Sequence, residues 1–238
     1  SGIFRRNKPA IINQEKPLPI LLNQAEKIQA QPSILNLDYS LVECKDSLMY
    51  ESNISKYDNL PYPRISGQHQ LKNLAGALRC IDFIQDYFKI TTNNIKSGIE
   101  NAKIRGRYDV VCKKPYVVTD VAHNGDASLS LSTTFLDHKN KGKTIAIFSI
   151  MNDKDIKSVV KPFLHIIDEW YISKLDSLRS ASISHIKSEI ESEEKSTCIK
   201  KYDSINSAYQ DALKNSEYDD NILIFGSFLV VSEIIHEN

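Results

Sequence analysis

Residues 116–124, YVVTDVAHN, run from a strand of β-branched side chains into a polar group. An arginine precedes this strand in Gly106-Arg107-Tyr108, and Asp120 and His123 follow it. Arginine offers a fixed fork of donors to oxyanions, whereas a carboxylate accepts hydrogen bonds from hydroxyl or ammonium groups. The grouping therefore favours an enzyme site for a phosphate ester and a small anionic substrate.

Strand-like and helical runs alternate after residue 105. Strands are expected at 116–120, 144–150, 169–172, 197–200 and 222–225, and helices at 126–135, 155–166, 184–193, 205–214 and 228–236. Five such units in succession predict an α/β fold with a mainly parallel, helix-covered sheet. Ligands of such sheets bind beyond the carboxyl ends of the strands, where Asp120 and Gly226-Ser227 are expected to lie.

The first hundred residues predict a mixed block of strands and helices. We expect a strand at 9–12, a helix at 20–30, β segments within 33–50 and a turn at 58–63. Apolar residues at three- and four-residue spacing predict a helix over 68–88. Thr92 is the expected N-cap of a further helix that ends near residue 103.

Composition limits the possible classes of protein. With 238 residues, 41% hydrophobic, the chain can bury one large core or two modest ones. Thirty basic and thirty acidic side chains cancel, so no global field attracts nucleic acid or an anionic membrane. Without a membrane-length apolar run or a signal-peptide pattern, a soluble, cytoplasmic protein is expected. Four scattered cysteines without a CxxC pair are expected to be buried, reduced thiols.

Six short motifs follow one another along the chain. They are Ser1-Gly2-Ile3-Phe4-Arg5, Gly67-Gln68-His69-Gln70 with NLAGAL at 73–78, Gly106-Arg107, Asp120-Val121-Ala122-His123-Asn124, Met151-Asn152-Asp153-Lys154-Asp155 and Phe225-Gly226-Ser227-Phe228. In this order they resemble folylpolyglutamate synthase, whose bacterial form often also acts as dihydrofolate synthase. This Mur-type ligase has an amino-terminal ATPase domain and a carboxy-terminal Rossmann-like domain. The resemblance implies that residues 1–104 are the C-terminal part of the ATPase domain and that 105–238 form the Rossmann-like ligase domain.

The start of the chain fits that division. It opens without methionine on an apolar segment, and no G-x-x-x-x-G-K-[ST] run occurs in it. We therefore expect a fragment. The resemblance implies that the phosphate-binding loop, the Mg²⁺ ligands and most folate contacts lie upstream of Ser1. Accordingly, we expect no metal ligand within these residues and no activity from them alone.

The resemblance also implies a reaction. An ATP-dependent ligase would add L-glutamate to folate and also to dihydropteroate. The acceptor carboxylate attacks the γ-phosphate of ATP, and the glutamate amino group then attacks the acyl phosphate. Cations that offset charge on the phosphates assist the first step, and close positioning of the amine assists the second. ATP and Mg²⁺ are the implied cofactors, and a monomer is expected.

Four residues match nucleotide or catalytic positions of the family. Arg107 would engage ATP phosphates, with a surface arginine as the alternative. Asp120 would contact the nucleotide on its ribose side, or else serve as a helix cap or turn former. Asn73 would approach the nucleotide, or else face solvent. His123, with Asp120 the candidate catalytic residue, would position glutamate, or else bond to a backbone carbonyl at the strand end.

Further residues match weaker landmarks. Ser227 would hold the glutamate carboxylate, or else cap the last helix. Arg179 would contact the anionic amino acid, or else lie in a solvated loop. Lys154 and Asp155 would border the cleft, or else form a charged first helical turn. Gly125 replaces the proline that is common in the family after His-Asn, which loosens the turn.

Two other functions remain open from the sequence. One is another Mur-type amino-acid ligase, and the other is a non-catalytic Rossmann-like binding module. A dinucleotide-binding dehydrogenase is disfavoured, because His123-Asn124-Gly125 follows the strand in place of a G-x-G-x-x-G turn.

Overall fold

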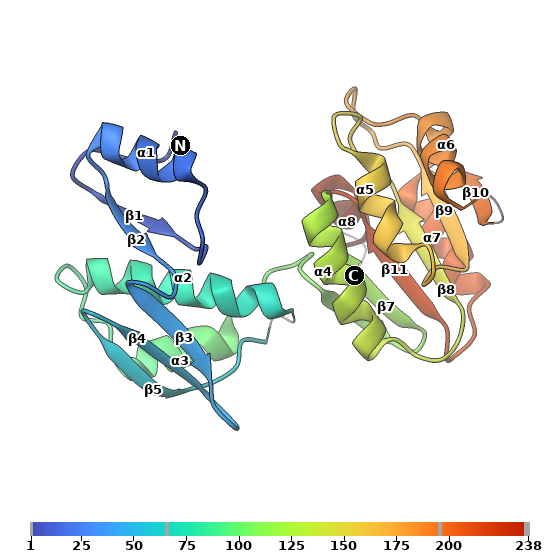
Figure 1. The fold of residues 1–238 in the computed structure, drawn as a ribbon. Helices are drawn as coiled ribbons and strands as arrows, with labels where there is room; N and C mark the ends of the chain where they lie inside the picture. Colours follow the sequence, from blue (N-terminus) through green and yellow to red (C-terminus); the bar gives the residue numbers. More distant parts are fainter. Residues whose placement is uncertain (1, 65–66, 195–196, 236–238) are drawn as a thin grey trace. The chain divides into compact units, whose positions relative to one another are not determined.

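The computed structural model describes residues 2–64, 67–194 and 197–235 (Figure 1). The chain divides into two compact units, Ser1–Lys103 and Ile104–Asn238. Each unit has its own buried apolar core, so each is described by itself.

The described residues of the first unit form two small sheets and three helices. In chain order these elements are β1 (Pro9–Ile12), α1 (Pro19–Ile28), β2 (Gln31–Ile34), β3 (Tyr39–Glu43), β4 (Leu48–Ser52), β5 (Lys56–Leu60), α2 (Gln68–Ile84) and α3 (Thr92–Asn101). Strands β1 and β2 pair in parallel across α1, whereas β3, β4 and β5 form an antiparallel meander (Figure 1). Helix α2 packs against strands of both sheets and presents its apolar stripe to the core.

A buried ionic network ties the meander to α2. The carboxylate of Asp82 accepts hydrogen bonds from the Tyr50 hydroxyl at 2.6 Å, from Ser52 Oγ at 2.7 Å and from Arg79 Nη1 at 3.1 Å. Arg79 also donates through Nε to Ser33 Oγ at 2.8 Å. The side chains of Arg79 and Asp82 are almost completely buried, and the several partners of each charge offset the cost of removing it from water.

Three predictions for the first unit are wrong in detail. The expected turn at 58–63 begins inside a strand, since β5 extends to Leu60. The long helix ends at Ile84, four residues earlier than its apolar spacing predicts. Thr91, rather than Thr92, caps α3, because its side chain accepts from the backbone N–H of Asn94.

The second unit is built on one six-stranded sheet in the order β10-β9-β8-β11-β7-β6. Its strands are β6 (Asp109–Lys113), β7 (Tyr116–Asp120), β8 (Thr144–Phe148), β9 (Glu169–Ser173), β10 (Cys198–Tyr202) and β11 (Asn221–Phe225). Strands β7 to β11 run parallel, and β6 is antiparallel to its neighbour β7. Strands β7, β8 and β11 are buried along their whole length, as expected of parallel strands covered on both faces.

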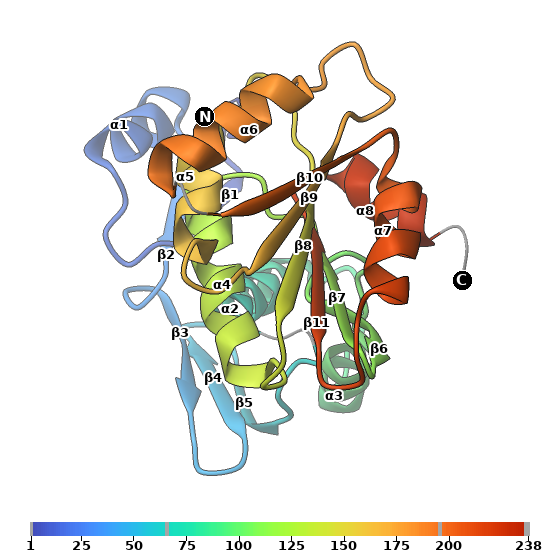
Figure 2. The same cartoon turned by 90° about the vertical axis from the view of Figure 1, so that its right-hand side faces the viewer.

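Helices cover both faces of this sheet (Figure 2). One face carries α4 (Gly125–His138), α5 (Ile156–Val160), the 3₁₀ helix η1 (Lys161–Phe163) and α6 (Ile183–Glu193), and the other carries α7 (Ile205–Lys214) and α8 (Phe228–Ile235). Two separate apolar clusters, one for each face, form the core of the unit. The predicted α/β class with a mainly parallel sheet is thereby confirmed.

Local details of the second unit differ from the predictions. The helix expected at 155–166 is cut into α5 and η1, because Pro162 lacks a backbone N–H and its ring disfavours a continuous helix. The antiparallel edge strand β6 was not predicted. The cysteines are free thiols but not buried: Cys44, Cys80 and Cys198 are exposed and Cys112 is partly exposed.

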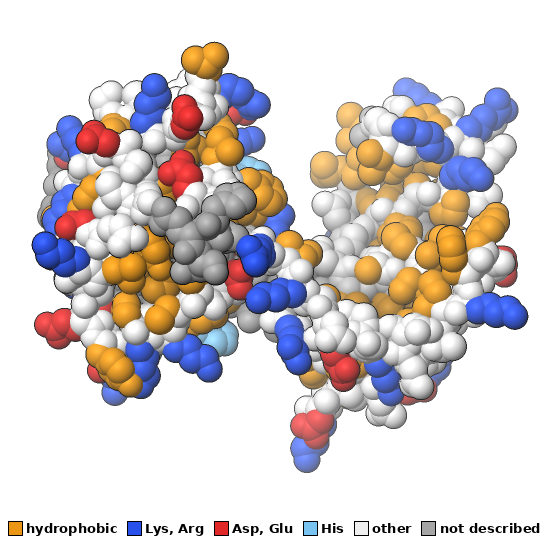
Figure 3. Space-filling model, turned by 180° about the vertical axis from the view of Figure 1, so that it is seen from behind, with side chains coloured by type: hydrophobic (Ala, Val, Ile, Leu, Met, Phe, Trp, Pro, Cys, Tyr) orange, Lys and Arg blue, Asp and Glu red, His pale blue; other side chains and the backbone are white. Residues whose placement is uncertain are grey.

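The surface carries charges of both signs. Basic and acidic side chains are interspersed on the visible face of the second unit (Figure 3), in keeping with the zero formal net charge of the chain. None of the helices formed by the described residues is long and apolar enough to cross a membrane.

Candidate functional site

The carboxyl ends of three central strands lie side by side. In the register of the sheet, Phe225 at the end of β11 pairs with Asp120 of β7 on one side and with Phe148 of β8 on the other. The helices that follow β7 and β8 cover one face, whereas α8, which follows β11, covers the other (Figure 2). Such a point of opposite connections is where open α/β sheets form a ligand crevice.

A glycine turn leads from β11 into α8 at this edge. Gly226 has φ +120°, and a Cβ atom there would lie 2.2 Å from the backbone oxygen of Ser149. Ser227 is buried, and its hydroxyl accepts from the backbone N–H of Val230 at 3.2 Å. The helix-capping alternative for Ser227 is therefore present in the structure, and the side chain lies at the predicted edge.

A second tight turn carries Arg107 to the same edge. Gly106 has φ +73°, and its carbonyl accepts from the backbone N–H of Val121 at 2.9 Å. The guanidinium carbon of Arg107 lies 6.0 Å from the centroid of the Phe228 ring, at the start of α8. Arg107, the end of β7 and the start of α8 are thus brought together, and the partly exposed guanidinium offers donors to an anion.

Asp120 ends β7, and both of its carboxylate oxygens accept hydrogen bonds from backbone N–H groups. Oδ2 accepts from the N–H of Tyr108 at 2.8 Å, and Oδ1 accepts from the N–H of Ala122 at 2.7 Å. The side chain is buried, with 9% of the residue exposed. The turn-forming alternative for Asp120 is therefore present in the structure, and its contact with a nucleotide stays a prediction.

His123 lies two residues further along, in the loop before α4. Its Nδ1 is 2.8 Å from the carbonyl oxygen of Val121, so Nδ1 carries a hydrogen and donates it. In the neutral ring, Nε2 then holds a lone pair that can accept a hydrogen bond or a proton. Asn124 follows as the N-cap of α4, accepting from the N–H of Ala127 at 2.9 Å, and the helix begins at Gly125.

The loop after β8 is joined to the loop after β9. Arg179 is exposed, and its guanidinium lies 3.3 Å from the carboxylate of Asp153. The backbone N–H of Asn152 also donates to the carbonyl of Arg179 at 2.8 Å. Asp155 caps α5 by accepting from the N–H of Ser158 at 3.2 Å, and Lys154 is paired with Asp153 at 3.6 Å. These contacts match the loop alternative for Arg179. The first-turn alternative for Lys154 and Asp155 is wrong in detail, because α5 begins at Ile156 and both residues precede it.

Asn73 lies in the first unit, on α2. It is exposed, and its amide donates to Gln70 Oε1 at 3.1 Å. The solvent-facing alternative fits this position, and its approach to a nucleotide stays a prediction.

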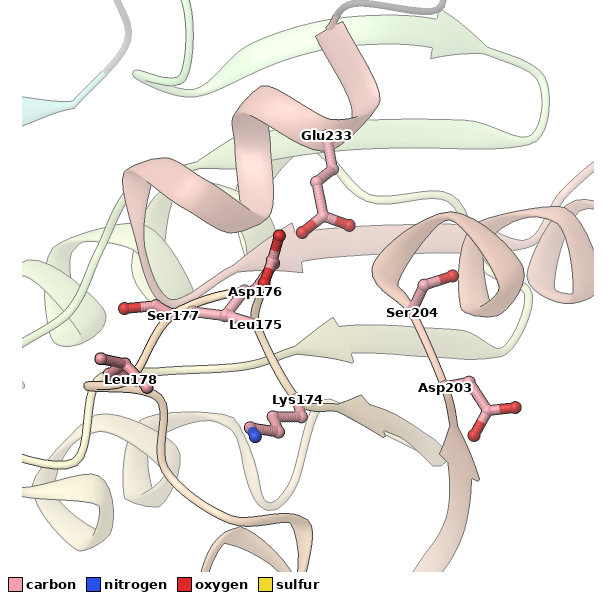
Figure 4. A pocket seen from close by; sticks show the side chains of 8 residues that line it. All are labelled: Lys174, Leu175, Asp176, Ser177, Leu178, Asp203, Ser204 and Glu233. Atoms are coloured by element: carbon pink, nitrogen blue, oxygen red, sulfur yellow. The ribbon is translucent and has the colours of Figure 1, made fainter.

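A separate hollow of about 700 Å³ lies beyond the ends of β9 and β10. It is lined by Lys174, Leu175, Asp176, Ser177, Leu178, Asp203, Ser204 and Glu233 (Figure 4). Asp176 and Glu233 face one another, and burial, assisted by the charge of Asp176, raises the pKa of the Glu233 carboxyl. None of these residues was predicted as a site residue. The available signal was that Lys174 and Asp203 directly follow strands β9 and β10.

Within residues 2–64, 67–194 and 197–235, no group of three or more His, Cys, Asp and Glu side chains is arranged to hold a metal ion. The described residues therefore do not fit a metal centre.

Comparisons with known proteins agree on one family. The family model described as "Mur ligase, glutamate ligase domain" matches residues 106–228. The chain is 34% identical over 238 residues to dihydrofolate synthase/folylpolyglutamate synthase of Buchnera aphidicola subsp. Schizaphis graminum, covering 99% of this chain and 54% of that relative. The Escherichia coli protein of the same name is 25% identical over 235 residues, covering 99% of this chain and 53% of the relative.

Solved structures show the same likeness. Escherichia coli FolC in complex with DHPP and ADP superposes with a TM-score of 0.85 at 25% identity, covering 99% of this chain and 54% of that one. A bifunctional folylpolyglutamate synthase/dihydrofolate synthase with Mn, AMPPNP and L-glutamate bound has the same fold, with a TM-score of 0.84 at 24% identity and with 99% and 54% covered.

These matches agree with the sheet topology and with the order of the motifs. The chain belongs to the Mur ligase family through its glutamate ligase domain. Within that class it is a homologue of dihydrofolate synthase/folylpolyglutamate synthase. The chain spans about half the length of the relatives it matches.

Proposed function

We propose that this chain is part of an ATP-dependent ligase that adds L-glutamate to folate, and also to dihydropteroate, through an acyl phosphate. The observation that carries the proposal is the convergence of Arg107, Asp120, His123 and Ser227 on one edge of the sheet, at its switch point. The likeness to bifunctional synthases over 99% of the chain supports the choice of substrates.

In this proposal the two parts of the chain have different tasks. Residues 1–104 are the last part of an ATPase domain, in which Asn73 approaches the nucleotide. Residues 105–238 are the ligase domain, whose Arg107 brings positive charge to the ATP phosphates, where negative charge develops during transfer. The phosphate-binding loop and Mg²⁺ ligands are assigned to polypeptide outside these residues, so the 238 residues alone are inactive.

His123 and Ser227 receive the incoming glutamate. The lone pair of His123 Nε2 accepts a hydrogen bond from the glutamate amino group and helps to keep it unprotonated for attack. The Ser227 hydroxyl and the first amides of α8 hold a glutamate carboxylate, and Arg179 adds positive charge from the neighbouring loop. Alignment of the amine with the acyl phosphate supplies most of the acceleration of this step.

Two alternatives lead to different results in one experiment. Another Mur-type ligase would use the same edge of the sheet with a different amino acid or acceptor. A non-catalytic binding module would bind nucleotide or glutamate without forming an amide.

The test uses the longest natural polypeptide that contains this sequence. It is incubated with ATP, Mg²⁺ and labelled L-glutamate or D-glutamate, with tetrahydrofolate or dihydropteroate as acceptor, and products are identified by mass spectrometry. We expect L-glutamate to be joined to both acceptors. Ligation of another amino acid would support the first alternative, and binding without ligation would support the second.

A pair of matched variants connects the activity to the site. Arg107→Ala is expected to lower kcat/KM for ATP by about tenfold or more, equivalent to about 1.4 kcal/mol of transition-state stabilisation. Arg105→Ala removes the same charge from an exposed position two residues away and is expected to leave kcat/KM unchanged. Equal effects of the two variants would contradict the assignment of Arg107.

A further inference from the structure

The turn that carries Arg107 is fixed to the end of β7 by reciprocal hydrogen bonds. The carbonyl of Gly106 accepts from the N–H of Val121 at 2.9 Å, and the N–H of Tyr108 donates to Asp120 Oδ2 at 2.8 Å. The two bonds flank Arg107 on both sides along the chain. Its backbone is therefore held at a fixed place relative to the sheet.

Packing reinforces this attachment. A Cβ atom on Gly106 would lie 3.0 Å from Val121 and 3.1 Å from Val231, so the turn is seated closely between the end of β7 and α8. Tyr108 is buried, and its hydroxyl donates to the carbonyl of Thr134 at 3.3 Å. The residue adopts φ +46°, a left-handed conformation that is costly for a bulky side chain and needs surrounding contacts to maintain it.

The Asp120 carboxylate joins the turn to the end of β7 through both of its oxygens. Its second oxygen accepts from the N–H of Ala122 at 2.7 Å, which fixes the rotamer of the side chain. A charged acceptor makes a stronger hydrogen bond to a backbone N–H than a neutral one does. Removal of this carboxylate would leave the N–H groups of Tyr108 and Ala122 without their acceptor in a buried place.

From these contacts we propose that Asp120 is a positioning residue for Arg107: its carboxylate holds the Gly106–Tyr108 turn so that the guanidinium is already in place before a nucleotide binds. The effect on catalysis rests on the proposed function, in which Arg107 engages the ATP phosphates. It differs from the role that the family resemblance implies, in which Asp120 contacts the ribose directly.

The clamp itself is tested by hydrogen exchange on the 238-residue chain, which requires no catalytic activity. In Asp120→Ala, the Tyr108 amide is expected to exchange at least tenfold faster than in the wild type, while the amide of Leu223 in the central strand β11 keeps its protection. Asp109→Ala removes a carboxylate next to Tyr108 and is the matched control, expected to leave the Tyr108 amide protected. Unchanged exchange of the Tyr108 amide in Asp120→Ala would overturn the proposal.

The effect on Arg107 is tested by a double-mutant cycle in the ligating polypeptide, with kcat/KM for ATP as the readout. If Asp120 acts through Arg107, the double variant Arg107→Ala/Asp120→Ala is about as impaired as Arg107→Ala alone. Losses that multiply would show an independent contact of Asp120 with the nucleotide and would overturn the proposal. Asp120→Asn, which keeps one acceptor oxygen, is expected to give an intermediate loss and guards against misfolding of the alanine variant.

The hydrogen-exchange and kinetic experiments distinguish failure of the positioning role from failure of the proposed function. If the wild-type polypeptide forms no glutamyl product, the proposed function fails, while the exchange rate of the Tyr108 amide still decides whether the clamp exists.

Discussion

Gly226→Ala perturbs the turn between β11 and Ser227, and the structure allows its cost to be worked out. At φ +120° an alanine pays for a left-handed backbone, which costs about 1–2 kcal/mol. Its Cβ would also lie 2.2 Å from the Ser149 oxygen and 2.9 Å from Phe148 Cε2, and relief of such overpacking costs about 1–3 kcal/mol. We expect the free energy of unfolding of the second unit to fall by about 3 kcal/mol, taking the lower part of both ranges.

Trp170 provides the assay, because it is the only tryptophan in the chain and is fully buried in β9. Its ring meets the Phe148 ring edge-on with centroids 5.8 Å apart, so its fluorescence reports on the packing that Gly226→Ala disturbs. With a slope of about 2 kcal/mol per M urea, the unfolding midpoint should fall by about 1.5 M.

Two other glycines serve as controls for this experiment. Gly98 has open space where a Cβ would be, in the middle of α3, so Gly98→Ala should stabilise the helix by up to about 1 kcal/mol, measured by circular dichroism. Gly142→Ala should lower the Trp170 midpoint, because its Cβ would lie 2.4 Å from the Asp219 oxygen, yet it lies before β8 and away from Ser227. A decrease in the midpoint of less than about 0.5 M for Gly226→Ala would refute the reasoning, since it would amount to less than about 1 kcal/mol.

Three further predictions concern ionic groups and nucleotide. Burial alone would raise the pKa of the Glu169 carboxyl, but hydrogen bonds from Lys200 and Lys143 hold it below its usual value of 4.5. The stabilising contribution of this carboxylate is therefore fully present above about pH 4.5 and is lost as the pH falls through the lowered pKa. The difference in urea midpoint between wild type and Glu169→Gln should be largest at pH 7 and should decrease as the pH falls below about 4.5. Arg79→Ala should lower the free energy of unfolding of the first unit by about 3–5 kcal/mol, followed by circular dichroism, because it leaves the Asp82 carboxylate buried without its cation; a loss below 1 kcal/mol would contradict this. The purified 238-residue chain should show no Mg²⁺-dependent hydrolysis of ATP in a phosphate-release assay, and measurable turnover would contradict the assignment of the phosphate-binding loop to polypeptide outside it.

The regular parts of the fold could be predicted because they depend on local signals. The run of β-branched residues at 116–120 and the amphipathic run at 205–214 match β7 and α7 residue for residue. Strand β6 was missed because its half-buried and exposed residues follow no regular alternation, and a bulge interrupts its pairing at the sheet edge, which gives a weak pattern. The helix expected at 155–166 was overextended because its apolar spacing continues across Pro162.

The site was predictable in location but not in its bonding. That Asp120 and Ser227 would share one edge follows from the rule for the carboxyl ends of parallel strands, and the register of β7 and β11 confirms it. That both Asp120 oxygens accept backbone N–H groups depends on the path of the chain through Tyr108, which no spacing in the sequence encodes. The roles of the individual residues toward nucleotide and glutamate stay predictions.

Backbone strain in the second unit is concentrated at the edge of the sheet that holds Arg107 and Ser227. Among its described residues, the left-handed positions are Gly106 at φ +73°, Tyr108 at φ +46° and Gly226 at φ +120°, and all three lie at the edge that holds Arg107 and Ser227. Such conformations persist only where surrounding contacts over-determine them, as the bonds to Asp120 and Val121 and the packing of Gly226 on Ser149 do here. Since those contacts are internal to the second unit, the turns can keep their geometry without a ligand. The free energy of ordering them is then supplied by folding. Under the proposed function, the free energy of nucleotide binding would therefore remain available to lower the barrier of phosphate transfer.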